Sequence, residues 1–388
     1  MSKQFNIKHL RIFLAAAHYG SFSHVAADFM LSQPAIAQAI SGLELKIGRR
    51  VFERTAGGLL LTQEGELLRA RCVRALGYLD PVLDRAGAKV KAAATTSQLL
   101  AATTLAETES YTIAAKQLGL SQSTVHRAVA ELENVADSCL FDRVGNKTIP
   151  TRLAFDLAQA YTLAFRELAQ AQMEIMQISG AGSAKLSIAV STQCPASIVS
   201  NSLQSLKARC PAIAVEVVDL PPDQIAKSLA VGRVDAGLAC IGDETIPAEI
   251  RKLARCPLKL KLAWRVEEES DSEGLEAVPT NRWWAVPNDQ TYAYKLFTAW
   301  LHDENCSFPT SFISTDNLQI LRSLVLDAGF VAVVHEDEFT GLNNVGAVSI
   351  PSHEYEFVVL VRADWKPTKL QELAMRRIEE AVACCPTV

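Results

Sequence analysis

Several features of common protein classes are missing from this sequence of 388 residues. No stretch approaches the roughly 18 uninterrupted apolar residues that a membrane-spanning helix needs. The first residues run straight into an amphipathic pattern and lack the apolar core of a secretory signal. The nine cysteines are scattered without metal-ligand spacing, and their number is odd. We therefore expect a cytoplasmic chain with reduced thiols and no bound metal.

Motifs of catalysis and cofactor binding are missing as well. The seven histidines form no i,i+4 pair and no HExxH, and neither a Walker motif nor GxGxxG occurs. Catalysis would need a nucleophile–base pair or a metal cluster. We therefore expect no enzymatic activity and no cofactor. A chain of this length should form roughly two or three domains.

Charge is distributed unevenly along the chain. The net charge is −5, yet residues 1–91 carry 13 Lys and Arg against 7 Asp and Glu. Residues 92–179 carry 6 against 9, and residues 180–388 carry 19 against 27. A basic head on an acidic body predicts that only the head meets a polyanion.

The N-terminal half contains an internal repeat. Leu31–Glu44 (LSQPAIAQAISGLE) returns 89 positions later as Leu120–Glu133 (LSQSTVHRAVAELE). Six of these fourteen positions are identical, where average composition gives about one by chance. The same offset places Thr62 on Thr151. We name the two modules copy one (residues 5–62) and copy two (residues 97–150).

Copy one has the pattern of a winged helix-turn-helix. Apolar residues recur at helical spacing over Asn6–Tyr19, and a short second helix is predicted over His24–Met30. Ser32 then caps a third helix with Pro34 in its first turn. Two short strands around Gly57-Gly58 follow as a wing. Copy two repeats these parts, with a shorter wing around Gly145-Asn146-Lys147.

A helix fits the major groove of DNA, and its N-terminal turn lies nearest the base edges. Arginines beside the wing would contact phosphates and position the module. The DNA-binding residues predicted in copy one are Ser32, Gln33, Pro34, Gln38, Ser41, Arg49, Arg50 and Arg54. Those predicted in copy two are Ser121, Gln122, Thr124, His126, Arg127, Arg143 and Lys147. The alternative interpretation is a helical hairpin with a capped, solvated face.

The residues of copy one resemble the DNA-binding domain of the LysR-type transcriptional regulators. The matching residues are Phe13, Ala16, Gly20-Ser21-Phe22, Leu31-Ser32-Gln33-Pro34-Ala35, Leu43-Glu44, Gly48, Phe52, Arg54 and Leu61–Gly65. Ala37 and Gly42 depart from that pattern, where the family often has Ser and a basic residue. Copy two is an addition to the usual single domain, and two accounts of it stay open: auxiliary DNA contact, or a structural spacer.

A long helical segment follows each module. Residues 63–93 and 151–179 are predicted linker helices, and Pro81 is expected to break or kink the first. The apolar stripe of the second needs a partner, for which a second chain or the chain's own core are the candidates. The resemblance implies a homodimer or homotetramer formed through these helices.

From residue 183 to 388 strands alternate with helices, which predicts parallel sheets covered by helices. This body resembles the two-lobed effector-binding domain of the same regulators, similar in fold to periplasmic solute-binding proteins. The segments that carry the likeness are Gly232–Leu238 and Leu324–Val334. The expected fold class is multidomain α and α/β, with two tandem winged helix-turn-helix domains and a two-lobed α/β effector domain.

Ligands of open α/β sheets bind at the carboxyl ends of the strands. Two polar clusters are predicted to face each other there, with three further residues as walls, although helix capping alone also explains Ser and Thr at such places. The clusters are Ser191, Thr192 and Gln193, and Ser314 and Thr315; the walls are Trp264, Asn288 and His335. We expect a small carboxylate, aromatic acids included, as the effector.

Cysteine chemistry offers a weaker signal. Cys194 lies at the start of a predicted helix, where a thiolate is favoured. No resolving partner is evident for it in the sequence, and the neighbours of Cys384-Cys385 are unremarkable.

Taken together, the sequence predicts a sequence-specific DNA-binding transcriptional regulator controlled by a small-molecule effector. Double-stranded operator DNA is the expected partner, with RNA polymerase as a further partner if the protein activates transcription. The alternatives are a ligand-binding α/β protein or enzyme with a degenerate DNA-binding head, and an architectural DNA-binding protein without a ligand.

Overall fold

The computed structural model describes residues 5–55, 58–145, 147–178, 184–209, 213–242, 245–266, 278–279, 281–351 and 355–383. The chain divides into two compact units, Met1–Ala184 and Lys185–Val388. In the described part no helix is long and apolar enough to span a membrane. Gly57, Asn146 and the Cys384-Cys385 pair, which the sequence singled out, lie outside the described residues.

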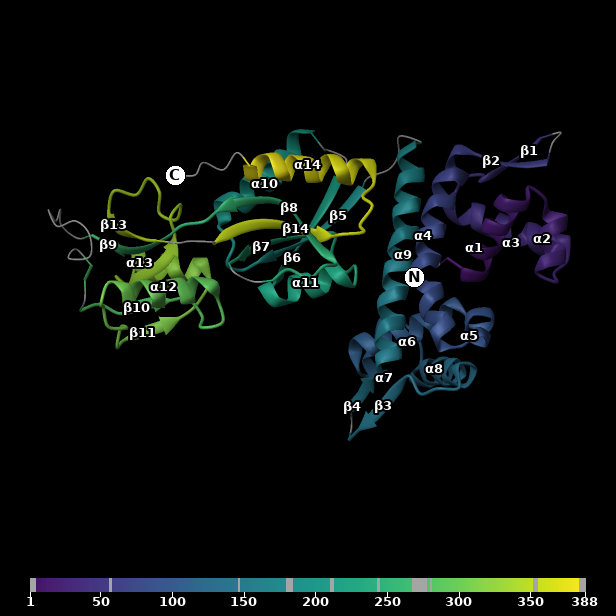
Figure 1. Cartoon of the computed structure of the whole chain (residues 1–388), viewed down its shortest axis with the longest axis horizontal. Coiled ribbons are helices and arrows are strands. Elements are labelled where there is room, and N and C mark those ends of the chain that lie inside the picture. The colour runs from purple at the N-terminus through teal and green to yellow at the C-terminus, as the bar shows by residue number, and fades with distance from the viewer. Residues whose placement is uncertain are drawn as a thin grey trace. The chain divides into compact units, whose positions relative to one another are not determined.

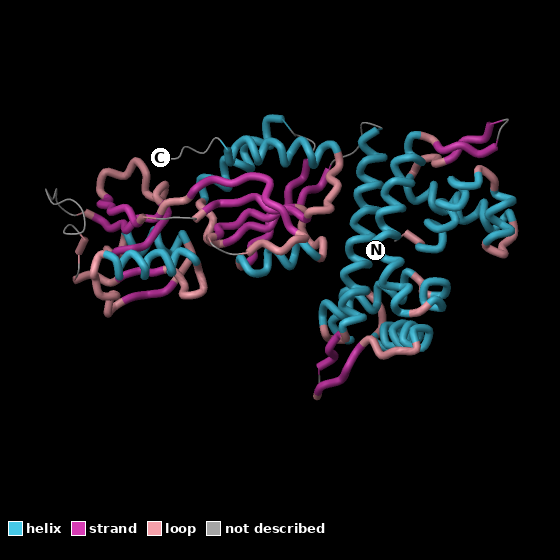
Figure 2. The backbone as a smooth tube through the Cα atoms, in the orientation of Figure 1, coloured by secondary structure: helices cyan, strands magenta, loops and turns pink. Residues whose placement is uncertain are grey.

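The N-terminal unit is built from two equivalent modules and three connecting helices. Copy one comprises α1 (Ile7–Tyr19), α2 (Phe22–Asp28), α3 (Gln33–Ile47), β1 (Phe52–Thr55) and β2 (Gly58–Leu61). Copy two comprises α6 (Thr96–Thr108), α7 (Tyr111–Leu118), α8 (Gln122–Ala136), β3 (Phe141–Val144) and β4 (Lys147–Pro150). The connecting helices are α4 (Gln63–Ala86), α5 (Ala88–Ala93) and α9 (Arg152–Ile178). Each wing is an antiparallel pair of strands, and Figure 2 separates these strands from the helices by colour.

The same local interactions shape both modules. The Ser32 hydroxyl accepts a hydrogen bond from the Ala35 N–H, and the Ser121 hydroxyl accepts one from the Thr124 N–H. These caps satisfy N–H groups that the first turn of a helix leaves free. One carboxylate oxygen of Glu44 accepts from the Val51 N–H at 2.9 Å. Glu133 and Leu140, each 89 positions later, repeat this bond at 2.8 Å.

Helix α4 continues through Pro81, where the sequence predicted a break or kink, and it ends only at Ala86. The proline ring crowds the carbonyl of the residue four positions earlier, and that residue is Gly77, which has open space around it. Beyond Pro81, Val82 and Leu83 are buried in the core of the unit. Burial of the last helical turn therefore outweighs the cost of the proline.

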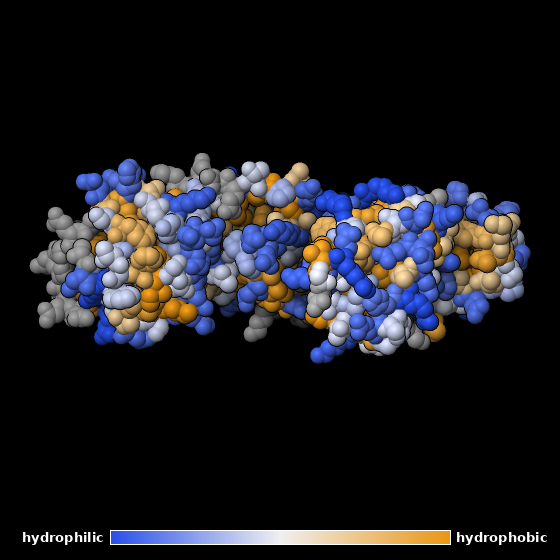
Figure 3. All heavy atoms as spheres, turned by 90° about the horizontal axis from the view of Figure 1, so that it is seen from below, coloured by the Kyte–Doolittle hydropathy of each residue, from blue (hydrophilic) through white to orange (hydrophobic). Residues whose placement is uncertain are grey.

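Helices α4 and α9 lie side by side and share one hydrophobic core (Figure 1). The apolar stripe of each helix is covered by the other helix of the same chain, with Leu68, Cys72 and Leu79 on α4 and Leu157 and Leu168 on α9 all buried. The chain's own core is thus the partner of this stripe. On the face drawn in Figure 3, apolar side chains form separate patches among hydrophilic ones. Dimerisation itself stays a prediction.

The C-terminal unit contains two five-stranded sheets. The first lobe holds β5 (Ala184–Ser191), α10 (Ala196–Arg209), β6 (Ile213–Leu220), α11 (Pro222–Ala230), β7 (Ala236–Ile241), β8 (Ile250–Pro257), β14 (Glu356–Arg362) and α14 (Lys369–Ala383). The second lobe holds β9 (Leu260–Arg265), β10 (Trp284–Val286), α12 (Tyr292–Asp303), β11 (Phe312–Ser314), α13 (Leu318–Leu326), β12 (Val331–His335) and β13 (Val345–Ile350). The strand orders are β6-β5-β7-β14-β8 and β11-β10-β12-β9-β13.

Both sheets are mixed, whereas the alternation of elements predicted parallel sheets. β5 pairs with β7, and β10 pairs with β11 and β12, in parallel. β14 runs antiparallel to β7 and β8, and β9 runs antiparallel to β12 and β13. The chain enters the second lobe through β9 and returns to the first lobe through β14. These two crossings between the lobes therefore account for the antiparallel pairs that the sequence did not predict.

Candidate DNA-binding surface and effector pocket

The N-terminal turn of α3 is open to solvent. The five DNA-binding residues predicted around this turn and the exposed face of α3 are all exposed: Ser32, Gln33, Pro34, Gln38 and Ser41. The Gln33 side-chain amide donates a hydrogen bond of 2.8 Å to the Ser23 hydroxyl, which ties the start of α3 to α2. The tip is therefore held by its own module while its remaining polar groups face outward.

Three arginines flank this tip and its wing. Arg49, Arg50 and Arg54 are exposed, and none of them forms an ion pair with a described residue. The Thr62 hydroxyl donates to the Arg50 carbonyl oxygen at 2.9 Å and fixes the backbone at that point. A fixed backbone with unneutralised cations is the arrangement that phosphate contacts require.

The corresponding tip of α8 is more occupied by its own contacts. Ser121, Gln122, Arg127, Arg143 and Lys147 are exposed, whereas Thr124 and His126 are half-buried. The Thr124 hydroxyl lies 2.8 Å from the Ser121 hydroxyl. The His126 ring stacks on Tyr111, with centroids 3.6 Å apart and planes 7° from parallel. Of the predicted copy-two residues, these two are therefore the least available to DNA.

Copy two also lacks cations that copy one has. Positions 138 and 139, which correspond to Arg49 and Arg50, hold Ser138 and Cys139. Arg127 lies 3.9 Å from Glu131 in an exposed i,i+4 pair, so part of its charge is neutralised. Aligning the sequences of the two copies already shows the loss of these two arginines.

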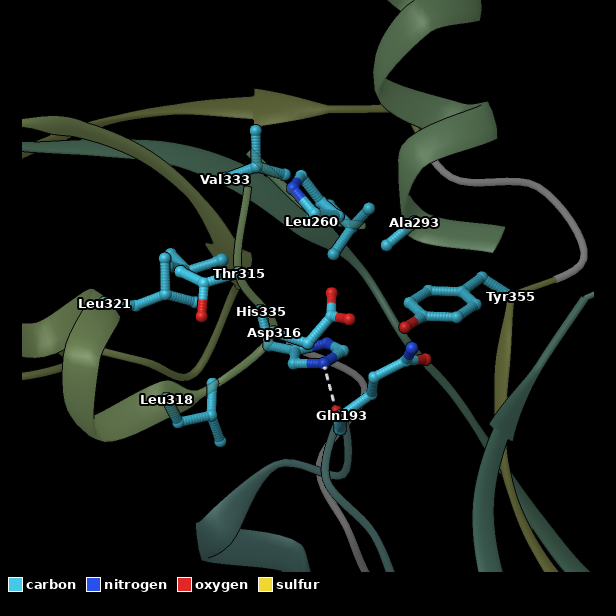
Figure 4. Close-up of a pocket in the computed structure, with 12 residues that line it drawn as sticks. Gln193, Leu260, Ala293, Thr315, Asp316, Leu318, Leu321, Val333, His335 and Tyr355 are labelled. Carbon is cyan, nitrogen blue, oxygen red and sulfur yellow. Dashed lines mark hydrogen bonds between the residues drawn. The ribbon is translucent and has the colours of Figure 1, made fainter. Parts of the chain in front are cut away.

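Residues from both lobes of the C-terminal unit line a partly open pocket (Figure 4). Gln193 and Tyr355 come from the first lobe, and the other lining residues come from the second. The full lining is Gln193, Leu260, Pro287, Ala293, Thr315, Asp316, Leu318, Leu321, Val333, Val334, His335 and Tyr355. No lysine or arginine belongs to this lining among the described residues.

His335 connects the two lobes at the bottom of this pocket. Its Nε2 lies 2.8 Å from the Gln193 carbonyl oxygen (Figure 4), and its ring stacks on Tyr355 with centroids 5.7 Å apart. Burial lowers the pKa of the His335 imidazole, against the smaller opposing effect of the Gln193 bond. The neutral ring donates from Nε2, which leaves Nδ1 as an acceptor, and Nδ1 has no hydrogen-bond partner among the described residues.

The sequence missed two polar residues of the pocket, Tyr355 and Asp316. The Tyr355 hydroxyl is buried without a hydrogen bond of good geometry, although the Cys240 thiol lies beside it. Burial raises the pKa of Tyr355 well above its ordinary value. Asp316 follows Ser314-Thr315 directly and presents a carboxylate to the pocket (Figure 4). Only Asp316 was within reach of sequence reasoning, because it directly follows the predicted cluster of Ser314 and Thr315 at the end of β11.

Of the eight predicted effector residues, Gln193, Thr315 and His335 line the pocket. The others stand behind the lining or away from it. The Ser314 hydroxyl donates to the Asn288 side-chain oxygen at 2.8 Å, and the Asn288 N–H donates to Asp316 at 3.1 Å.

Three predicted effector residues have other roles or positions. The buried Ser191 hydroxyl accepts from the Gln193 N–H, and Thr192 is exposed. Trp264, predicted as a wall, does not line this pocket, because it lies four residues further along β9 than Leu260. Its indole packs on Gly346, where a Cβ would come within 2.7 Å of the ring.

A thiol partner for Cys194 is present in the structure, whereas the sequence showed none. The sulfurs of Cys194 and Cys240 lie 3.9 Å apart, and both residues are buried. Burial raises the pKa of the Cys240 thiol well above its ordinary value, so this thiol stays protonated and weakly nucleophilic.

Comparison with known proteins agrees with this architecture. Residues 7–66 and 96–154 both match the family described as bacterial regulatory helix-turn-helix protein, lysR family. Residues 179–383 match the LysR substrate binding domain. The chain belongs to the LysR family. It is therefore a LysR-type transcriptional regulator with DNA-binding and substrate-binding domains, and the DNA-binding domain of the family occurs in it twice.

One curated relative matches most of the chain, and another matches a shorter stretch. The HTH-type transcriptional regulator GalR of Pseudomonas putida is 25% identical over 342 residues, which cover 85% of this chain and 84% of GalR. The regulator YdcI of Escherichia coli is 37% identical over 79 residues, which cover 20% of this chain and 26% of YdcI. A full-length OxyR variant of Pseudomonas aeruginosa shares the fold, with a TM-score of 0.50, 14% identity, and coverage of 74% of this chain and 94% of the OxyR chain.

Proposed function

We propose that copy one reads operator DNA with the N-terminal turn of α3, while Arg49, Arg50 and Arg54 contact phosphates. The observation that carries this proposal is the exposed tip flanked by three arginines without an ion-pair partner among the described residues. Glutamine can bond an adenine edge through two hydrogen bonds, which contribute about 1–3 kcal/mol of discrimination. We assign this role first to the exposed Gln38, because the Gln33 amide is already bonded to Ser23.

DNase footprinting and binding isotherms of the full chain test this proposal. Gln38→Ala should weaken binding to the preferred site about 5- to 150-fold and leave binding to random DNA unchanged. Gln224→Ala, an exposed glutamine on α11, is the matched control and should change neither. Equal loss on both kinds of DNA would contradict base reading by α3. Absence of any preferred fragment would favour the alternative of a degenerate DNA-binding head.

For the effector, the pocket favours a different chemistry from the carboxylate that the sequence suggested. Its lining carries the Asp316 carboxylate, and no cation stands opposite it among the described residues. The buried Nδ1 of His335 lacks a donor, and the Tyr355 hydroxyl lacks a partner of good geometry. These groups fit a small, uncharged or cationic effector that donates hydrogen bonds, such as a polyol or an amine. A second carboxylate beside Asp316 would be repelled.

Calorimetric titration of the full chain with small polyols, amines and carboxylates separates these classes. A polyol or amine should bind, and Asp316→Asn should weaken it about 10- to 100-fold, as expected for a lost hydrogen bond to a charged group. Asp289→Asn, an exposed carboxylate nearby in sequence, should leave the affinity unchanged. A carboxylate that binds more tightly, and whose affinity Asp316→Asn does not lower, would contradict the proposal.

The remaining partners follow from the role of a regulator. A transcriptional regulator works where the chromosome is, which supports a cytoplasmic location. Effector binding between two lobes can change their relative orientation and so reach the DNA-binding heads. RNA polymerase is a partner if the chain activates transcription, and in vitro transcription with and without the bound effector measures the sign.

A further inference from the structure

Helices α4 and α9 bury the same face. Each follows its module at the same point, and their sequences are related by the offset of 89. Buried positions of α4 therefore have counterparts that are also buried in α9. The buried counterparts include Leu68 and Leu157, Cys72 and Tyr161, Ala75 and Ala164, Leu79 and Leu168, and Val82 and Ala171. A surface that packs against its own equivalent is what a two-fold axis produces.

Ion pairs define the register of this contact. Arg71 pairs with Glu174 at 2.8 Å, and Arg85 pairs with Asp156 at 3.0 Å, so the two helices run antiparallel. In copy-one numbering Glu174 is position 85 (174 − 89) and Asp156 is position 67 (156 − 89). The midpoints of both facing pairs thus fall near position 76, and Leu76 and its equivalent Phe165 lie near the axis.

A second contact also fits a two-fold axis between the copies. The Ile7 N–H donates a hydrogen bond of 3.1 Å to the Thr96 hydroxyl. Ile7 and Thr96 are 89 residues apart and open the equivalent helices α1 and α6. Equivalent residues can touch each other only close to the axis that relates them. Accordingly, the wings β1–β2 and β3–β4 lie at opposite ends of the helix pair (Figure 1).

Charge makes the contact specific for one α4 and one α9. Helix α4 supplies Arg71 and Arg74 to a buried cluster, and α9 supplies Glu167 and Glu174. Two α4 helices in the same register would place Arg71 against position 85, which is another arginine. Two α9 helices would place Asp156 against Glu174. Pairing α4 with a second α4, or α9 with a second α9, would therefore bring like charges together. This repulsion disfavours symmetric pairing of two chains through α4 alone or through α9 alone.

We infer that one chain holds both heads of a two-headed DNA reader, joined by the α4–α9 contact, and that a single chain occupies two half-sites. Two-fold-related helix-turn-helix modules bind half-sites about one helical turn (roughly 34–36 Å) or a multiple of it apart. The inference rests on the proposed DNA binding of copy one and extends it to copy two. Because the tips of α3 and α8 differ, as at Gln38 and Arg127, the two half-sites differ in sequence.

Footprinting of the full chain with one head weakened at a time tests this. Arg49→Ala/Arg50→Ala weakens copy one, and Arg127→Ala/Lys147→Ala weakens copy two; all four residues are exposed. Lys369→Ala/Arg376→Ala, two exposed cations on α14, is the control for lost charge. Each head variant should lose protection of one half-site and keep the other. Its salt slope should fall by about 0.9 for each lost phosphate contact.

Mixing the two head variants distinguishes heads of one chain from heads of two. Over a range of concentrations, the mixture should not restore the wild-type affinity for DNA that carries both half-sites, because no chain carries two intact heads and each half-site is bound separately. Restoration would mean that α4 of one chain pairs with α9 of another and would overturn the inference. An unchanged footprint of the copy-two variant would also overturn it, since two copy-one heads would then fill the site. If the wild type protected no DNA at all, the proposed function would fail instead.

Discussion

Copies one and two have the same backbone and different surfaces. All five elements of copy two start and end within a residue of the offset of 89 from those of copy one. Buried residues and caps are retained, as in Ile36 and Val125, Leu43 and Leu132, and Ser32 and Ser121. Solvent-facing positions have changed from Arg49-Arg50 to Ser138-Cys139. The comparison shows that packing and capping maintain the module, while the chemistry offered to DNA varies independently.

The connecting helices show the same division. Their apolar faces correspond, yet α4 contributes the cations and α9 the carboxylates of a buried cluster. Burial alone would lower the pKa of the Arg71 guanidinium, and the hydrogen bonds and charges of Glu174 and Glu167 raise it instead. The two helices are thus equivalent in position and apolar face but complementary in charge.

The largest effect is expected where this complementarity is removed. Glu167 is 1% exposed and accepts from both Arg71 and Arg74. Glu167→Ala leaves two guanidinium groups short of their partner and should cost about 3–5 kcal/mol of unfolding free energy. Denaturant unfolding followed by helical circular dichroism measures it. Glu66→Ala, from an exposed pair with Arg69 on α4, is the control, and an equally small cost for both would refute the buried cluster as the link.

The next effect is on DNA affinity. Removing the three copy-one arginines as Arg49→Ala/Arg50→Ala/Arg54→Ala should lower the salt slope by about 2.7 and the affinity about 100-fold near 0.15 M salt. Arg143→Ala, which changes the one equivalent cation of copy two, should lower affinity only about 5-fold. Fluorescence anisotropy against salt concentration measures both. A loss from Arg143→Ala as large as that from the triple variant would contradict the account.

A smaller effect concerns backbone strain, which the copies carry at different turns. Left-handed positions hold glycine in copy one and other residues in copy two: Gly20 against Glu109, and Gly48 against Asp137. The reverse holds at the turn before the third helix, where Met30 has φ 52° and Gly119 has φ 65°. A side chain in this conformation costs about 1 kcal/mol. Glu109→Gly and Met30→Gly should each raise the unfolding free energy by that amount, and a loss of stability would show that these side chains make compensating contacts.

The smallest effect is a pH dependence confined to copy one. The Lys46 ammonium lies 4.5 Å from the centre of the Phe5 ring and has no hydrogen-bond partner among the described residues. Burial lowers its pKa from 10.5 to about 8. Between these values the unfolded chain binds the proton more tightly, so stability should rise with pH from about 8. Lys46→Met should abolish the rise in melting temperature, and Lys8→Met, at an exposed lysine, should not.

Local interactions explain how much of the fold was predictable from sequence. The caps at Ser32 and Ser121 and the helical stripes are encoded within a few residues, so they could be read directly. The duplicated core pointed to the modules for the same reason. Which surface covers an apolar stripe depends on tertiary packing and cannot be read from nearby residues. The pairing of Arg71 with Glu174, which are 103 residues apart, likewise has no local signal.

The effector pocket was predictable only in part for the same reason. Gln193, Thr315 and His335 were accessible because strand ends mark the rim of a sheet. Tyr355 reaches the pocket from the first lobe, immediately before β14. Its contribution depends on how the chain returns from the second lobe, and no pattern in the sequence specifies that return.

Selection of binding sites from random-sequence DNA by the wild-type full chain tests the central claim most directly. The account predicts enrichment of two elements with different sequences, about one helical turn or a multiple apart, because α3 and α8 of one chain offer different side chains. A perfect palindrome would mean that two identical heads from two chains read the site, and it would contradict the account.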